Sequence, residues 1–343
     1  MNKKLIALAV AGACVAPTVM AQTANPVTLY GRVYLTVESV EADGDAGYDQ
    51  RTRMQDQASL LGVRGTEDLG GGLKAFFQLE TAFAPDQTGG SFANRNSGIG
   101  LQGGFGSVLM GRWDMPFKSA AIGVDPFGDL TIGGITGTLS DLGNFDRRDN
   151  NVIQYWSPNM GGFAFRLAMT TNEGKTATLD PQDFGANVTF RRGPMYLFGV
   201  YEQHDDVSAT IREEKGYAAG GSFSFGPIKI GGQYQQIEKD VVGSPRDDQK
   251  SWMANIVYTL GKNQFIGQYM TSENHNNING AECDTFHLGY QYNFTKRTFM
   301  LAQYSEIDNN ALGRCNFGSG RINASGAGEF DPSGFSIGMR HVF

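Results

Sequence analysis

The stretch Val27–Ser39 reads VTLYGRVYLTVES and alternates strictly between apolar and polar residues. Its odd-numbered positions are mostly valine and leucine, whereas its even-numbered positions carry tyrosine, arginine, threonine and glutamate. Successive side chains of a β-strand point to opposite faces, so one face of this segment is apolar and the other is polar. Alternation sustained over about ten residues is typical of a strand that crosses a membrane as part of a barrel.

The same alternation recurs along the rest of the chain, for example in residues 72–83, 161–171, 250–260 and 284–294. Counting every such segment gives sixteen strands, an even number, as is usual for outer-membrane barrels. Aromatic residues near strand ends are expected to form girdles at the membrane interfaces. These girdle candidates are Phe163, Tyr196, Tyr217, Trp252, Tyr258, Phe294 and Phe299. The sixteen predicted strands cover residues 27–39, 57–68, 72–83, 95–104, 107–113, 150–157, 161–171, 183–191, 194–204, 216–225, 228–237, 250–260, 264–273, 284–294, 298–307 and 333–343.

The connections between these strands alternate between short and long. The short ones carry turn residues, such as Gly70-Gly71, Gly193-Pro194 and Gly226-Pro227, whereas the long ones are polar. A soluble all-β protein has no reason to alternate loop lengths so regularly. Because lipid cannot satisfy a free strand edge, the sheet has to close on itself. The sequence therefore predicts an all-β fold, a 16-stranded antiparallel transmembrane β-barrel.

The N-terminus has the features of a cleaved signal peptide. Lys3 and Lys4 precede an apolar stretch over residues 5–15, and Val19-Met20-Ala21 offers a cleavage site with small residues. The apolar stretch is shorter than the ~20 residues that a membrane-spanning helix needs. We therefore expect a signal peptide over residues 1–21 and one barrel domain over residues 22–343, in an exported protein.

Composition and charge restrict the class of partner. Loss of two lysines with the signal peptide takes the net charge from −7 to −9. Such a chain has no basic excess to displace counterions from phosphates, so nucleic acid is not an expected partner. Net charge does not decide which ions a pore would pass, because selectivity depends on the few charges at its narrowest point.

Cysteine and histidine usage gives no indication of a metal or cofactor. The four histidines fall in separate segments, and no Cys-x-x-Cys motif is present. Cys14 would leave with the signal peptide, and residues 11–13 lack the large aliphatic residue that a lipoprotein signal usually carries. Cys283 and Cys315 lie at the edges of the last two long connections, which are neighbours in an antiparallel barrel. We expect them to form a disulfide.

Several motifs, in the order in which they occur, resemble the general porins of Gram-negative bacteria. Residues 27–32 read VTLYGR, residues 65–80 read GTEDLGGGLKAFFQLE, and residues 100–106 read GLQGGFG. Arg148-x-x-Asn151 follows, and the chain ends in SIGMRHVF over residues 336–343. Each motif alone is weak, but together and in this order they are specific.

The resemblance implies a passive diffusion channel in the bacterial outer membrane that serves ions and small hydrophilic solutes. It implies a homotrimer surrounded by outer-membrane lipid and lipopolysaccharide. The terminal Phe343 resembles the signal that the barrel-assembly machinery recognises during biogenesis.

The resemblance also implies that the third long connection, residues 114–149, folds into the barrel and narrows it. Its acidic residues Asp125 and Asp129 would then face a basic wall. The resemblance places Arg32, Arg95 and Arg148 in that wall, with Arg147 as a further candidate. One departure weakens the wall, because Leu60 stands where the family often has an arginine. The sequence therefore does not predict strong anion selectivity.

Alternation assigns further side chains to the lumen. In the first strand Arg32 and Tyr30 lie on the face opposite the valines and leucines. The same reasoning points Lys74, Gln78, Glu80 and Arg166 into the lumen.

Two other functional classes stay open. The first is a substrate-specific channel on the same barrel, which would show saturable block by one solute. The second is a non-conducting barrel that serves as an adhesin or an enzyme. No Gly-x-Ser-x-Gly motif occurs, so a barrel hydrolase would lack its most recognisable nucleophile setting. Enzymatic activity is therefore not expected.

Overall fold

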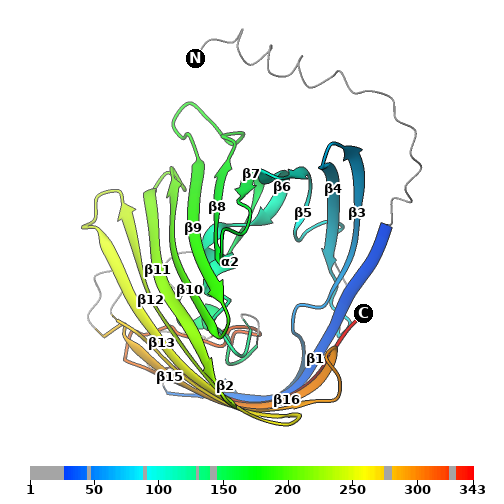
Figure 1. Ribbon diagram of the computed structural model, residues 1–343. Helices are drawn as coiled ribbons and strands as arrows, with labels where there is room; N and C mark the ends of the chain where they lie inside the picture. Colours follow the sequence, from blue (N-terminus) through cyan, green and yellow to red (C-terminus); the bar gives the residue numbers. More distant parts are fainter. Residues whose placement is uncertain are drawn as a thin grey trace.

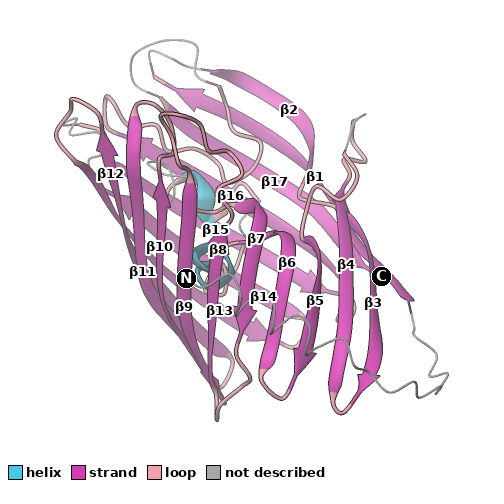
Figure 2. Ribbon diagram, turned by 90° about the horizontal axis from the view of Figure 1, so that it is seen from above, coloured by secondary structure: helices cyan, strands magenta, loops and turns pink. Residues whose placement is uncertain are grey.

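The computed structural model describes residues 27–44, 48–87, 91–128, 131–139, 145–273, 280–323 and 330–343. These residues form one closed antiparallel β-barrel, and its strands surround an interior through which none of them runs (Figures 1 and 2). Short turns lie at one end of the barrel, and the longer connections lie at the other (Figure 2). The expected signal peptide at 1–21 and the expected constriction residue Asp129 lie outside the described residues.

Within the described residues, seventeen strands are labelled in chain order, together with the helix α2 (Pro116–Ala121) and the 3-10 turn η1 (Ile135–Gly137). The strands are β1 (Val27–Asp43), β2 (Tyr48–Asp56), β3 (Leu60–Gly70), β4 (Leu73–Ala82), β5 (Ser97–Gly103), β6 (Gly106–Asp114), β7 (Arg148–Trp156), β8 (Phe163–Thr170), β9 (Gln182–Arg192), β10 (Met195–Asp205), β11 (Ile211–Phe225), β12 (Ile228–Val241), β13 (Asp247–Leu260), β14 (Asn263–Ser272), β15 (Cys283–Asn293), β16 (Thr298–Asn309) and β17 (Asp331–Val342).

β2 and β3 are two parts of one barrel strand, because both pair with the same side of β1. β3 pairs with residues 27–32 of β1, and β2 pairs with residues 35–42. The barrel therefore has sixteen strands, as the sequence predicts. The break at residues 57–59 includes Ala58, which has a positive φ of 57°. It turns the Ala58 carbonyl group toward the guanidinium group of Arg32, whose Nε donates to it at 2.7 Å.

The barrel closes between β1 and β17, which pair from Arg32 with Val342 to Asp43 with Asp331. The last residue extends this closure: Gly31 N donates to Phe343 O at 3.1 Å, and Phe343 N donates to Gly31 O at 3.0 Å. Within the described residues the sheet therefore closes on itself, as a sheet that spans lipid requires.

The strand assignments from sequence agree with the structure except on the side of the long connections. There the strands continue beyond the alternating pattern, so that the predicted loop over residues 40–56 is mostly β1 and β2. β12 and β13 likewise run several residues into the predicted loop over 238–249. Outside the hydrocarbon both faces of a strand can be polar, so backbone pairing persists where alternation has ended.

The outward face of the barrel is apolar over its middle and aromatic toward its ends. In β13 the outward residues Trp252, Ile256 and Tyr258 are all exposed, as expected for a surface that lipid covers. Tyr258, Phe265 and Tyr290 occupy matching positions on three neighbouring strands, and the ring of Phe265 lies between the other two, with centroids 6.4 Å and 5.4 Å from theirs. Two of the expected girdle residues do not belong there, because Tyr196 and Phe299 line cavities inside the barrel.

Among the described residues, no helix is long and apolar enough to cross a membrane. α2 has six residues and lies inside the barrel (Figure 1).

A charge on the outward face should destabilise the folded protein in lipid. Ile256, at 48% exposure, lies between Trp252 and Tyr258 on that face. Ile256→Lys should lower the free energy of unfolding in phospholipid vesicles by roughly 2–4 kcal/mol, measured by urea titration. The lumen-facing variant Thr259→Lys is the control and should change it by less than about 1 kcal/mol. Equal losses in the two variants would contradict the assignment of faces.

Candidate functional site in the barrel lumen

The connection between β6 and β7 lies inside the barrel against one wall. Its helix α2 contacts β8, β9, β10 and β11. The apolar residues of this connection form a cluster with inward-facing apolar residues of β10 to β14. On the connection these are Phe117, Ala120, Ala121, Val124, Ile135, Leu139 and Phe145, and on the wall Tyr196, Phe198, Val200, Ala218, Ile237, Met253 and Met270. The inward-folded third loop that the sequence predicts is therefore present.

Polar side chains of the wall fasten the backbone of this loop along its length. Glu202 Oε2 accepts a hydrogen bond from Phe117 N at 2.9 Å, and this carboxylate is buried. The other contacts are Tyr196 Oη to Ala120 O at 3.0 Å, Asn255 Nδ2 to Val124 O at 3.1 Å and Gln268 Nε2 to Gly133 O at 3.0 Å. Buried backbone groups need such partners, so these side chains fix one path for the loop.

Two glycines of the wall make room for aromatic side chains of the loop. A Cβ atom at Gly216 would come within 2.6 Å of the ring of Phe145, and one at Gly289 within 2.6 Å of the ring of Phe127. Phe145 also stacks on His204 of the wall, with ring centroids 4.5 Å apart. The close approach of loop and wall therefore depends on residues without side chains at these positions.

The last long connection, between β16 and β17, covers the second half of the third loop. Asn316 N donates to Gly137 O at 3.0 Å, and Thr136 Oγ1 donates to Gly318 O at 2.9 Å. Cys283 and Cys315 are joined by a disulfide within a buried cluster that also contains Phe317. This bond ties the covering connection to the start of β15.

The wall opposite the docked loop carries two arginines that are paired with acids. Arg95 Nε lies 2.7 Å from Glu80 Oε1, and one terminal nitrogen of Arg148 lies 2.7 Å from Asp114 Oδ1. Asn96 joins the second pair, because its Oδ1 accepts from Arg148 Nε at 2.6 Å. The structure thus brings Arg95 and Arg148 to one region of the wall, each with its charge balanced by a neighbour.

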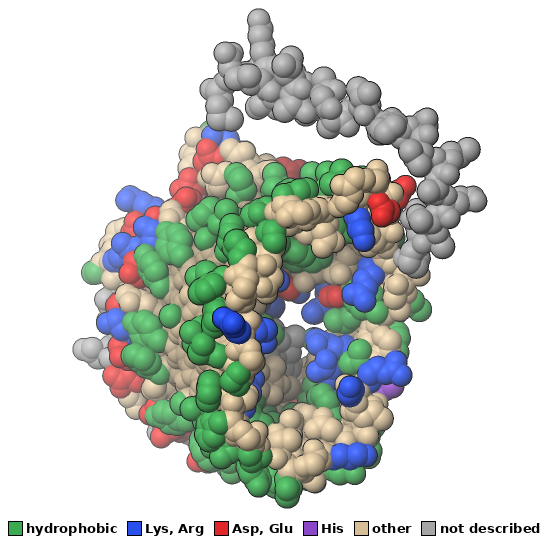
Figure 3. Space-filling model, in the orientation of Figure 1, with side chains coloured by type: hydrophobic (Ala, Val, Ile, Leu, Met, Phe, Trp, Pro, Cys, Tyr) green, Lys and Arg blue, Asp and Glu red, His purple; other side chains and the backbone are tan. Residues whose placement is uncertain are grey.

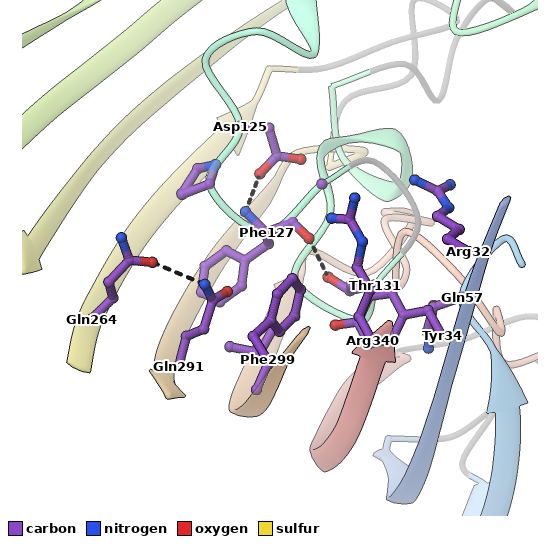
Figure 4. A pocket seen from close by; sticks show the side chains of 13 residues that line it. Arg32, Tyr34, Gln57, Asp125, Phe127, Thr131, Gln264, Gln291, Phe299 and Arg340 are labelled. Atoms are coloured by element: carbon purple, nitrogen blue, oxygen red, sulfur yellow. Dashed lines mark hydrogen bonds between the residues drawn. The ribbon is translucent and has the colours of Figure 1, made fainter. Parts of the chain in front are cut away.

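Arg32 faces the loop across a cavity of about 300 Å³ (Figure 4). The cavity is lined by Arg32 and Arg340 on the strand side and by Asp125 and Phe127 on the loop side. Asp125 also shapes the loop, because its Oδ1 accepts from Phe127 N at 2.9 Å and its Oδ2 from Ile135 N at 3.3 Å. Basic side chains of the strands and an acid of the loop therefore line the same cavity.

Arg147 has different acidic partners from Arg95 and Arg148. It forms ion pairs with Asp149 at 2.8 Å and Asp183 at 2.7 Å, at the base of the loop. Neighbouring residues of an extended chain point to opposite sides, so Arg147 and Arg148 reach different partners. The membership of Arg147 in the basic wall stays a prediction.

The remaining lumen assignments are compatible with the strand register. Tyr30 lies opposite Gly62, which lies opposite Glu80, and Tyr30 Oη donates to Glu80 Oε2 at 3.2 Å. Gln78 and Lys74 share the inward face of β4 with Glu80, and Arg166 lines an inner cavity. Leu60 lies between Arg32 and Ala82 on the same inward face and is only 8% exposed.

Sequence reasoning missed several inward-facing residues. Arg340 lies opposite Tyr34 on β17, and alternation with Ile337 and Met339 could have placed it in the lumen. Arg64 and Arg191 were detectable in the same way. The apolar inner wall was also missed; its signal is an apolar residue at an inward position, such as Val200.

Basic side chains gather beside the opening through the barrel (Figure 3). Arg64, Arg166, Arg191 and Arg340 each lie over an aromatic ring, and the described residues provide no carboxylate within ion-pair distance of them. The described part of the chain contains no group of three His, Cys, Asp or Glu residues placed to hold a metal ion.

Comparisons with known proteins agree with this architecture. Residues 7–312 match the family model described as Gram-negative porin. The chain is 33% identical to outer membrane porin protein 32 of Delftia acidovorans, with all of both chains covered. It is 26% identical to the major outer membrane protein P.IB of Neisseria meningitidis serogroup B, again over the full length of both.

A solved structure titled an anion-selective porin from Comamonas acidovorans superposes with a TM-score of 0.82 at 29% identity. The match covers 93% of this chain and 100% of that one. The OmpT outer membrane protein of Vibrio cholerae superposes with a TM-score of 0.72 at 18% identity, which supports the fold alone.

Weakening the aromatic anchor of the loop should release the loop without opening the barrel. Phe117 and Phe145 are fully buried, and the centroids of their rings lie 5.2 Å apart. Phe145→Ala should remove roughly 3–5 kcal/mol of packing and speed protease cleavage within residues 122–147, read by mass spectrometry. Phe184→Ala, which truncates an outward-facing ring, is the control and should leave that cleavage unchanged. Equal cleavage in both variants would contradict the anchoring role.

The disulfide should protect the last long connection. Protein folded under oxidising conditions should contain no free thiol, and Cys283→Ser should create one that reacts only after denaturation, since Cys315 is 1% exposed. The double variant Cys283→Ser/Cys315→Ser should lose about 2–4 kcal/mol of stability in urea titration. Two titratable thiols in the folded, oxidised wild type would contradict the bond.

Proposed function

This chain belongs to the Gram-negative porin family and is an outer-membrane diffusion channel, and we propose that its third loop and the facing arginines form a constriction that favours small anions. The observation that carries the proposal is the cavity in which Asp125 of the docked loop faces Arg32 and Arg340. The fixed path of the loop supports it, because a selective passage needs walls that hold their position.

The distribution of charge supports a preference for anions. The lumen carboxylates Glu38, Glu80 and Asp114 are each within 2.8 Å of an arginine, so their charges are largely balanced. Arg64, Arg166, Arg191 and Arg340 have no carboxylate at that range among the described residues. A low-dielectric wall around a narrow water-filled passage strengthens the effect of such uncompensated charges on passing ions. The solved relative titled as an anion-selective porin agrees with this preference.

The facing charges also suggest how the channel sorts solutes. Acids on the loop and bases on the wall produce a field across the passage. Polar solutes can align with that field, whereas apolar solutes have to displace ordered water to pass. Leu60, in place of a basic residue beside Arg32, weakens the field on this part of the wall.

We further propose that the channel assembles as a homotrimer in lipid and lipopolysaccharide, and that Phe343 is read by the barrel-assembly machinery. The hydrogen bonds between Phe343 and Gly31 support the second point, because a terminal residue that completes the barrel is a suitable checkpoint for closure.

Replacing one arginine of the wall should shift the selectivity. Arg95→Gln removes one positive charge, so that the pair with Glu80 changes from neutral to a net charge of −1. A chloride ion passing about 10 Å away loses roughly 0.4 kcal/mol of attraction, about twofold in relative permeability before screening by salt. The measurement is the reversal potential of purified channels in a planar bilayer under a KCl gradient.

The double variant Glu80→Gln/Arg95→Gln is the matched control, because it removes both charges together. It should return the reversal potential most of the way to the wild-type value. Unchanged selectivity in Arg95→Gln would contradict the role of this wall. Insertion without stepwise conductance in the wild type would contradict the channel function itself.

A further inference from the structure

We propose that the lumen contains a second binding site, near the short-turn end, for small organic dianions of the dicarboxylate class, held by Arg166 and Arg191. This proposal rests on the proposed channel function, since the site would lie on the permeation path. It is separate from the cavity between Arg32 and Asp125, with which it shares no lining residue.

The site is a cavity of about 420 Å³ between α2 and the inner faces of β5 to β10. Its position follows from the strand register: Trp156 lies opposite Arg166, which lies opposite Asn187, and Arg191 lies opposite Tyr196. Arg166, Arg191, Trp156 and Tyr196 are near short turns, so the cavity lies toward that end of the barrel. Its volume is within the range of cavities that bind small molecules.

Each arginine is held against an aromatic face. The guanidinium carbon of Arg166 lies 4.9 Å from the centre of the Trp156 ring, and that of Arg191 lies 4.4 Å from the centre of the Tyr196 ring. Stacking of this kind orients the planar group and leaves its N–H groups directed sideways. Both guanidinium groups are therefore arranged in advance for an acceptor.

The cavity offers no acid to neutralise these arginines. Its twelve lining residues include two arginines and no aspartate or glutamate. Asp114 acts on Arg166 electrostatically, but its carboxylate is already paired with Arg148 at 2.7 Å. In this respect Arg166 and Arg191 differ from Arg95, Arg147 and Arg148, each of which lies against a carboxylate.

Three other polar groups of the cavity are hydrogen-bonded to the docked loop. Tyr196 Oη donates to Ala120 O, Ser119 Oγ donates to Pro116 O at 3.1 Å, and Asn187 Nδ2 donates to Pro116 O at 2.8 Å. These bonds stiffen the cavity against the docked loop. The two guanidinium groups are the cationic donors that the cavity offers to a ligand.

The chemistry of the site favours a dicarboxylate over a simple halide. A guanidinium group matches a carboxylate through two parallel N–H···O bonds, and two guanidinium groups match two carboxylates. Trp156 and Tyr196 supply apolar surface for the carbon chain between them. A monoanion would engage only one arginine, so charge and geometry together select a dianion.

The test is block of chloride current by succinate, added on the short-turn side of single channels in a planar bilayer. Succinate should reduce the conductance in a saturable manner, whereas neutral succinamide should not. In Arg166→Gln/Arg191→Gln the half-blocking concentration should rise at least tenfold. Arg166→Lys/Arg191→Lys keeps the charge but loses the planar fork, and it should give an intermediate rise.

The matched control is Arg64→Gln/Lys74→Gln, which removes two positive charges from the lumen outside the cavity. Its half-blocking concentration should stay within about twofold of the wild type, because general attraction of anions is the only effect lost. An equal rise in this control, or no rise in Arg166→Gln/Arg191→Gln, would overturn the site. Normal conductance without block by succinate also overturns it, whereas absence of conductance would contradict the channel function instead.

Discussion

Hydrocarbon offers no partner to a backbone N–H or C=O group, so each strand of this chain has to pair on both sides. The closure between β1 and β17, extended by the bonds between Gly31 and Phe343, satisfies that requirement. Closure in turn creates an inner surface that no neighbouring strand can cover. The third loop and the charged side chains inside the barrel cover and line that surface.

The inner surface is divided into two unlike halves. From β10 to β14 it is apolar enough to bind the third loop, and buried Glu202 fixes the point where α2 begins. From β1 to β7 it stays polar and charged, with arginines held by acids, by a carbonyl group or by aromatic rings. The loop packs against the apolar part, and the space that it leaves open lies along the polar part.

Alternation and loop rhythm predicted the barrel, its sixteen strands and most inward-facing residues, because lipid enforces these patterns on every strand. These patterns could not predict where strands end outside the membrane, since around Glu41 and Asp43 both faces of the strand meet water. They also could not separate Arg147 from Arg148, because their partners Asp183 and Asp114 lie on strands distant in sequence. Such pairings depend on the three-dimensional path of the loop.

The net charge of the chain is −7, yet three carboxylates of the lumen, Glu38, Glu80 and Asp114, are each paired with an arginine. Arginines stacked on Tyr30, Trp156, Tyr196 and Phe299 keep their charge without an acidic neighbour. An aromatic face orients a guanidinium group without neutralising it. Stacked arginines therefore contribute positive potential to the lumen that no count of charged residues would indicate.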